Sequence, residues 1–159
     1  MELTAVVRDD ILKKVKRFSL PVTLEYVASE FRFDIEDVAI SILSIEELPT
    51  LNVERNLLYD LNELAKNLKD VDKDLVLSYI ESQSPNVSDL LKFNFHDCSL
   101  YSDITTDHEL GTYMVANNGF NLGLILKYLD YEKYGRDVRL EEGGSFTDRG
   151  YFLPKANRL

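Results

Sequence analysis

The sequence contains only one cysteine, Cys98, among its 159 residues. An internal disulfide is therefore excluded, and the cytoplasm is the compartment that this cysteine usage favours. No apolar run approaches the length of a membrane span, and residues 1–15 lack the apolar segment and cleavage site of a signal peptide. Internal repeats and low-complexity tracts are also absent from the sequence. We therefore expect a cytoplasmic protein built from ordinary packed structure.

Positive charge is scarce in the central part of the chain. The formal net charge is −10. Residues 1–17 contribute +2, residues 18–109 contribute −13 from nineteen acids and six bases, and residues 110–159 contribute +1. A surface that binds nucleic acid needs the opposite sign. The central part is therefore expected to repel DNA and to attract proteins that bind DNA.

Residues 2–18 are predicted to form an amphipathic helix. Their apolar positions fall on one stripe, and four bases crowd the last turns, where cations are favourable to the helix dipole: Lys13, Lys14, Lys16 and Arg17. Such a helix is either an ordinary charged surface helix or a basic arm that docks an acidic partner. The sequence leaves both interpretations open.

Apolar spacing and capping residues predict the elements that follow. Helices are expected over residues 24–31, 52–68, 72–83, 89–93 and 107–117. The expected N-caps include Thr23, Asp72, Ser88 and Thr106. Strands are expected over residues 38–45 and 93–100. A break at Gly143-Gly144 is expected to precede a hairpin over residues 145–153 that turns at residues 148–150.

The most distinctive stretch covers residues 128–151 and reads YLDYEKYGRDVRLEEGGSFTDRGY. Leu124, Tyr128 and Tyr131 recur at the spacing of one helix face. Gly135 suits the left-handed position that ends a helix. From the residues alone, this pattern indicates a packed, tyrosine-rich helix that closes at the glycine.

No constellation of residues in the sequence indicates an enzyme site. Cys98 and His96 would project to the same face of an extended strand, but no activating helix N-terminus or oxyanion loop accompanies them. With Asp107 and His108 they could in principle hold zinc, yet the spacing matches no paired Cys/His pattern. Adjacent acidic pairs point to different sides of a helix, and the glycine pair lacks the residues of a phosphate loop. We expect no catalysis, no cofactor and no bound metal.

Carboxylates on several short helices could imitate the phosphates of DNA. Duplex DNA presents one charge per about 1.7 Å of axis when both strands are counted. Helix residues three or four apart are separated by about 5–6 Å. Such imitation requires exposed, unpaired acids. The alternative interpretation is an acidic surface that only keeps the protein in solution, and charge alone leaves both open.

Residues 128–151 resemble the C-terminal segment of the ArdA family of antirestriction proteins, chiefly through the block Tyr134-Gly135-Arg136-Asp137. Residues 18–27 (FSLPVTLEYV) are similar to the strand–Pro–helix opening of that family, and residues 45–68 to its acidic link into a helix with Leu-Asn-Glu-Leu. The resemblance implies homodimeric DNA mimics, carried on conjugative plasmids and transposons, that occupy the DNA-binding channel of type I restriction–modification enzymes. It also implies strands before the Leu-Pro segment, where the residues themselves predict a basic helix.

The resemblance assigns two sets of residues. The dimer interface would contain Tyr128, Tyr131, Tyr134, Gly135 and Arg136. The acids that would imitate phosphates are those of the central part: Asp60, Glu63, Asp70, Asp72, Asp74, Glu81, Asp89, Asp97, Asp103, Asp107 and Glu109. No single one of these acids is expected to be essential.

We therefore predict an α+β fold of small modules in series that form an elongated body. The expected modules are a basic helical extension (1–17), a first α+β module (18–70), an acidic, mainly helical module (71–109) and a dimerising C-terminal module (110–159). The first functional hypothesis is a non-enzymatic mimic of DNA. The second is an interaction or regulatory module of a mobile element that docks an acidic partner through the basic N-terminal helix.

Overall fold

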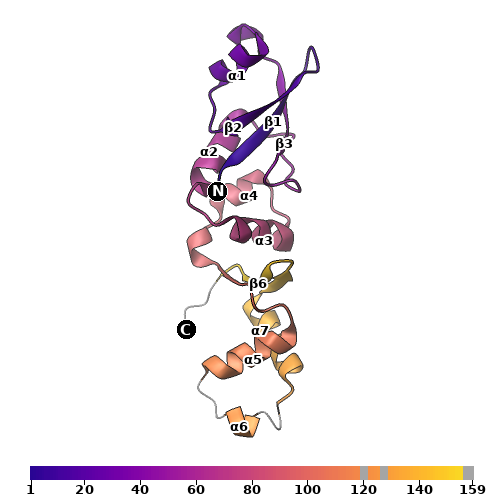
Figure 1. Ribbon diagram of the computed structural model, residues 1–159, viewed down its shortest axis with the longest axis vertical. Helices are drawn as coiled ribbons and strands as arrows, with labels where there is room; N and C mark the ends of the chain where they lie inside the picture. Colours follow the sequence, from indigo (N-terminus) through magenta and orange to yellow (C-terminus); the bar gives the residue numbers. More distant parts are fainter. Residues whose placement is uncertain (119–121, 126–128, 156–159) are drawn as a thin grey trace. The chain divides into compact units, whose positions relative to one another are not determined.

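The computed structural model describes residues 1–118, 122–125 and 129–155, and it confirms the predicted α+β fold (Figure 1). The chain divides into unit 1, Met1–Lys73 with Ser84–Phe93, and unit 2, Asp74–Gln83 with Asn94–Leu159. The elements of unit 1 are β1 (Leu3–Asp9), β2 (Val15–Leu20), α1 (Leu24–Phe31), η1 (Ile35–Asp37), β3 (Ile40–Ile45), α2 (Leu58–Leu68) and α4 (Val87–Lys92). Those of unit 2 are α3 (Lys73–Gln83, apart from its first residue), η2 (Phe95–Asp97), β4 (Ser99–Tyr101), α5 (Asp107–Asn117), α6 (Leu122–Ile125), α7 (Tyr131–Glu142), β5 (Ser145–Thr147) and β6 (Gly150–Leu153). None of the helices in the described ranges combines the length and the hydropathy that a membrane crossing needs.

The N-terminal residues form a β-hairpin, so the helix predicted over residues 2–18 is wrong. Alternate residues of β1 are buried, namely Leu3, Ala5, Val7 and Asp9. This period of two is that of a strand with one buried face, but the apolar residues also fit a helical stripe, and the many bases obscured the alternation. β1 is moreover the central strand of a sheet with the order β2-β1-β3. Residues 1–17 are therefore an integral part of unit 1 and not a helical extension.

The hairpin turns without glycine, proline or asparagine. Oδ1 of Asp9 accepts hydrogen bonds from the backbone amides of Ile11 and Leu12, at 2.8 and 3.1 Å. Lys13 takes the left-handed conformation, with φ of 60°. An aspartate that binds the amides following it stabilises a turn by replacing a backbone acceptor. This local role of Asp9 explains how the chain reverses here without glycine, proline or asparagine.

The sheet of unit 1 is antiparallel, and helices α1 and α2 lie on one side of it (Figure 1). The core residues that the strands contribute include Val7, Phe18, Ile42 and Ile45. Helix α1 has the predicted bounds, and its predicted N-cap is confirmed because Oγ1 of Thr23 accepts from the Tyr26 amide. The predicted strand over residues 38–45 is confirmed as β3.

Three element boundaries in the middle of the chain differ from the prediction. α2 begins at Leu58 and not at Asn52, because Asn52 binds the Glu54 amide through its side chain and makes a turn. α4 is capped by Asn86 and not by Ser88, since the Asn86 and Asp89 side chains accept from each other's amides at 2.8 and 3.0 Å. The strand predicted over residues 93–100 is a 3-10 turn, η2, followed by the short strand β4.

Two glycines allow α5 and α7 to pack with their backbones in contact. A Cβ atom on Gly135 would lie 1.7 Å from the Asp107 carbonyl oxygen, and one on Gly111 would lie 2.1 Å from the Tyr131 carbonyl oxygen. The prediction that Gly135 ends a helix is therefore wrong, because the glycine lies inside α7. The helix ends instead at Gly143, which has a φ of 71° and donates its amide to the Arg139 carbonyl.

The core of unit 2 lies between these two helices and a second antiparallel sheet of order β4-β6-β5. It contains Ile104, Leu110, Val138, Tyr151 and Leu153. The predicted hairpin over residues 145–153 is confirmed as β5 and β6, and the predicted helix over residues 107–117 is confirmed as α5 with Thr106 as its N-cap. The interpretation of Leu124, Tyr128 and Tyr131 as one helix face includes Tyr128, which lies outside the described residues.

Tyr151 makes the stability of unit 2 sensitive to alkali. Its hydroxyl donates to the Glu142 carboxylate at 3.1 Å, and burial raises the pKa of Tyr151 well above the ordinary value. In the unfolded chain this tyrosine ionises near pH 10, so above that pH the unfolded state loses a proton that the folded state keeps. The free energy of unfolding is expected to fall by up to about 1.4 kcal/mol per pH unit from this residue.

Urea unfolding of a Tyr151→Phe variant between pH 8.5 and 11.5 measures this effect. The variant is expected to lose less stability over that range than the unaltered protein. The matched control is Tyr113→Phe, because the Tyr113 side chain is 39% exposed in the same unit. If the free energy of unfolding falls equally with pH in the Tyr151→Phe variant and in the unaltered protein, this account is wrong.

Candidate partner-binding surface

The eleven acids predicted to imitate phosphates are all at least partly accessible. Eight are exposed: Asp70, Asp72, Asp74, Glu81, Asp89, Asp97, Asp103 and Glu109. Three are half-buried: Asp60, Glu63 and Asp107. They belong to both units, and each unit is acidic. Unit 1 contains sixteen acids and eleven bases, and unit 2 contains twelve acids and seven bases, so each carries a formal charge of −5.

Three of these acids have fixed positions because they cap helices. The carboxylates of Asp60, Asp89 and Glu109 accept from backbone amides at the starts of α2, α4 and α5. The strongest example is Glu109, which accepts from the Thr105 amide at 2.6 Å and also from the Thr105 hydroxyl and the Thr106 amide. The bond from the Thr105 amide lowers the pKa of Glu109. Capping therefore keeps this charge ionised and in a defined place.

Four other predicted acids are paired with bases. Glu63 contacts Lys66 at 2.8 Å on the surface of α2. In unit 2, Asp107 contacts Arg139 at 2.9 Å, and the hydrogen bond from Arg139 to this carboxylate raises the pKa of the guanidinium. Asp74 and Glu81 lie on the same side of α3 and both contact Arg149, at 3.3 and 3.4 Å. These pairs reduce the negative potential that the four acids present to a partner.

Three further acids carry charge without a recorded base beside them in the part of the chain that the structure describes. Asp70, Asp97 and Asp103 are exposed, and the structure records no ion pair for them among the residues it describes. Asp97 accepts only from the Asn94 side-chain amide, at 2.7 Å, which leaves its charge uncompensated. The predicted acids therefore differ in how far neighbouring groups compensate their charge: some are uncompensated, some cap helices and some are paired with bases.

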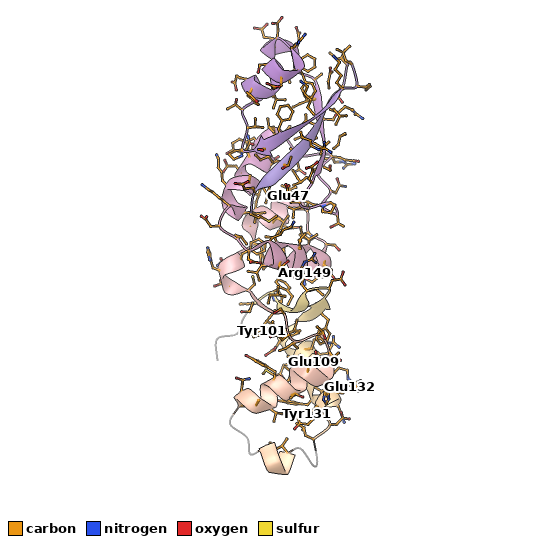
Figure 2. All side chains as sticks on the ribbon, viewed as in Figure 1. Glu47, Tyr101, Glu109, Tyr131, Glu132 and Arg149 are labelled. Atoms are coloured by element: carbon orange, nitrogen blue, oxygen red, sulfur yellow. The ribbon has the colours of Figure 1, made fainter. Side chains whose placement is uncertain are left out.

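Several exposed acids were not selected from the sequence. In unit 1 they include Asp34, Glu36 and Asp37 around η1, and in unit 2 they include Glu132, Asp137 and Glu141 on α7. Figure 2 labels Glu109, Tyr131 and Glu132 on this helical part of unit 2. The prediction considered only acids on or beside the central helices. The local density of acids around residues 34–37 was the signal that could have extended it.

The bases near the N-terminus do not form a basic arm. They lie on a hairpin, and three are paired with acids of unit 1: Arg8 with Asp10, Lys16 with Glu30, and Arg17 with Glu46. The hypothesis of a basic N-terminal helix that docks an acidic partner therefore loses the helix on which it depended.

Comparison with protein families shows which family this chain belongs to. The family model described as antirestriction protein (ArdA) matches residues 8–153, from within β1 to the last residue of β6. The chain belongs to the ArdA family. A comparison with curated proteins finds no match. The strands that the family resemblance implied before the Leu-Pro segment are present as β1 and β2, and it was the predicted helix that was wrong.

The residues of the ArdA-like block Tyr134-Gly135-Arg136-Asp137 have different environments within α7. Gly135 is buried against α5, Tyr134 packs beside the core of unit 2, and Arg136 and Asp137 are exposed. Tyr131 is half-buried, and its ring meets that of His108 with centroids 5.5 Å apart. Tyr128, also predicted at the dimer interface, lies outside the described residues. Among the predicted interface residues that the structure describes, Arg136 is the exposed one.

His96 and Cys98, which were considered as a base and a nucleophile, lie in η2 and directly after it. The Cys98 thiol donates to the Phe95 carbonyl at 3.1 Å, and burial raises the pKa of the thiol, so the reactive thiolate is disfavoured. His96 is exposed on η2. Among residues 1–118, 122–125 and 129–155, no group of three or more His, Cys, Asp or Glu side chains is placed to hold a metal ion.

Proposed function

We propose that this ArdA-family protein is a non-enzymatic mimic of DNA that inhibits type I restriction–modification enzymes by occupying their DNA-binding channel. The observation that carries the proposal is the family match over residues 8–153 in a chain whose two units each have a charge of −5. A channel that binds DNA is lined with lysine and arginine side chains. A ligand with a comparable array of negative charge can occupy it and, like DNA, loses its bound counterions on binding. Exposed carboxylates on both units supply such an array without any covalent chemistry.

We also propose that the protein acts in the cytoplasm of cells that carry a mobile element, as a homodimer joined through unit 2. The exposed surface of α7 supports this arrangement. It contains Arg136 together with Leu140, an apolar side chain that is 67% exposed. Its charges are mixed, with Glu132 and Asp137 beside Lys133 and Arg136, so two copies of this surface can approach without strong repulsion. Sedimentation of the purified protein measures the dimer directly.

Inhibition of a purified type I enzyme tests the proposed function. The protein is expected to displace fluorescent duplex DNA from the enzyme, and the displacement should weaken steeply as salt rises from 50 to 300 mM, because the contacts are charge–charge. The comparison protein is an unrelated acidic protein of similar size and net charge, which should not compete. Unchanged DNA binding and cleavage in the presence of excess protein would exclude this function.

A further inference from the structure

Strand β3 forms an edge of the unit 1 sheet that has neither charged residues nor proline. Its sequence, ISILSI, contains no charged residue and no proline. The opposite edge, β2, carries Lys16 and Arg17. Proteins commonly protect sheet edges with charged residues, proline or bulges. A bulge does occur at Leu43, which has no partner between the pairs Val6–Ser44 and Val7–Ile42, so the regular edge is confined to Ile40–Ile42.

Two residues of this regular edge direct their backbone groups away from the sheet. The Asp10 amide donates to the Ala39 carbonyl at 2.9 Å, so residue 39 hydrogen-bonds toward β1. In an antiparallel pair the direction of the backbone groups alternates along the strand. The N–H and C=O groups of Ile40 and Ile42 therefore face outward, in the positions that an additional strand would use.

A groove with an accessible volume of about 1020 Å³ lies beside this edge, entirely within unit 1. Its apolar lining comes from three elements: Leu24 at the start of α1, Ile40 and Ile42 of β3, and Leu57 and Tyr59 at the start of α2. Leu57 and Tyr59 are 71% and 70% exposed, although both are large apolar side chains. The groove can therefore receive apolar side chains from a segment that pairs with the outward-facing groups of β3.

The charges of the groove favour a basic segment. Glu25 and Glu54 line it, and the structure shows no ion pair for either one within the described ranges. Arg55 is the one base in the lining that lacks a recorded acidic partner there, because Lys66 is paired with Glu63. The lining thus contains two carboxylates and one guanidinium without a recorded ion pair, which leaves an excess of negative charge. The surrounding unit is acidic as well, which adds to the attraction for lysine and arginine side chains.

We propose that the β3 edge and this groove bind an extended polypeptide segment of a partner protein, in which the side chains on one face of the strand are apolar at the centre and basic at both ends. The segment adds a fourth strand to the sheet beside β3. The apolar side chains of that face enter the groove, and the basic side chains of the same face reach Glu25 and Glu54 in its lining. Strand addition provides affinity through backbone hydrogen bonds and specificity through alternate side-chain sites. This contact is separate from the proposed imitation of DNA, because it depends on backbone pairing and apolar burial.

Fluorescence anisotropy with synthetic peptides tests the proposal. The probe is a fluorescein-labelled heptapeptide of sequence Lys-Thr-Val-Thr-Ile-Thr-Lys, whose lysine, valine and isoleucine side chains share one face of a strand, and it is expected to bind the full chain. Two further peptides are methylated at alternate backbone amides, one in each register. The peptide that loses the donors that pair with β3 is expected to bind at least tenfold more weakly, and the other is expected to bind within twofold of the probe. Replacing the lysines with glutamate is expected to abolish binding. Failure of the first peptide to bind, or equal binding of all the peptides, would overturn the proposal.

Variants of the protein locate the contact. The double variants Leu57→Ser/Tyr59→Ser and Glu25→Gln/Glu54→Gln are each expected to weaken binding of the lysine peptide at least tenfold. Matched controls outside the groove lining, Ile11→Ser/Leu12→Ser and Asp97→Asn/Asp103→Asn, remove similar exposed groups and are expected to change binding less than twofold. Equal losses in the controls would show general attraction to an acidic protein. Self-association lost specifically in Leu57→Ser/Tyr59→Ser would show that a second copy fills the groove. Either result would reject the proposed ligand.

Discussion

Replacing Gly135 with alanine is expected to destabilise unit 2 by more than about 3 kcal/mol, since adding a methyl group to a well-packed site usually costs about 1–3 kcal/mol even where side chains can adjust. Here the added Cβ would lie 1.7 Å from the Asp107 carbonyl oxygen and 2.8 Å from the Gly111 amide nitrogen. Both obstacles are backbone atoms, so neither can rotate away. Relief requires α5 and α7 to separate, which exposes the core between them.

Urea unfolding and hydrogen exchange measure this loss. We expect a lower unfolding midpoint for Gly135→Ala and faster exchange of the α5 and α7 amides. The control is Leu140→Ala on the same helix, where a side chain that is 67% exposed is removed and stability should change by less than about 0.5 kcal/mol. Light scattering on the same samples separates packing from assembly. A Gly135→Ala variant that remains folded but becomes monomeric would assign the glycine to the dimer interface instead.

The role of Gly135 shows where prediction from the sequence stops. Local rules correctly located α1 and α5, because Thr23 and Thr106 act within three residues of themselves through their own helix amides. A glycine before polar residues satisfies the local rule for a helix end equally well. Its actual position is decided by Gly111, in another helix, and spacing along the chain contains no information about that contact. A glycine inside a helix usually reduces stability by about 1 kcal/mol relative to alanine, and the close packing of α5 against α7 offsets that loss here.

The N-terminal hairpin shows a related limit. Buried and half-buried residues alternate in β1, but seven residues are too few to exclude a helix when the apolar residues also fit a stripe. The turn depends on the Asp9 carboxylate and not on glycine or proline. The turn could be recognised only from the hydrogen bonds that the Asp9 side chain makes in the structure.

For the candidate surface, the sequence identified which residues are acidic but not which ones remain uncompensated. Asp107 pairs with Arg139, 32 positions further along the chain, and Glu81 pairs with Arg149, 68 positions further along. Such distant pairs depend on the tertiary fold. The groove beside β3 was also outside the reach of sequence patterns, since its lining comes from three elements whose arrangement is tertiary. The composition of a surface was therefore predictable, whereas its effective charge was not.

This difference in effective charge predicts which acids matter for the proposed inhibition of type I enzymes. Replacing Asp70, Asp97 and Asp103 together with asparagine is expected to weaken inhibition by about tenfold or more, if each exposed charge contributes about 0.5 kcal/mol at the interface. Asp103→Asn alone should change inhibition by less than about fivefold, because a distributed array has no essential member. The triple variant should also show a shallower dependence on salt, since fewer charge–charge contacts are made.

The matched control removes three exposed acids outside the predicted set, with the replacements Glu2→Gln, Glu141→Gln and Asp148→Asn. Both variants change the net charge from −10 to −7, because each loses three of the acids in the sequence. Displacement of fluorescent DNA from a purified type I enzyme compares them, and circular dichroism verifies that both remain folded. If the control weakens inhibition as much as the test variant, total charge alone determines binding. If neither variant weakens it, carboxylates do not take the place of phosphates. A selective loss in the test variant would mean that the enzyme recognises where these charges lie, which is what imitation of DNA requires.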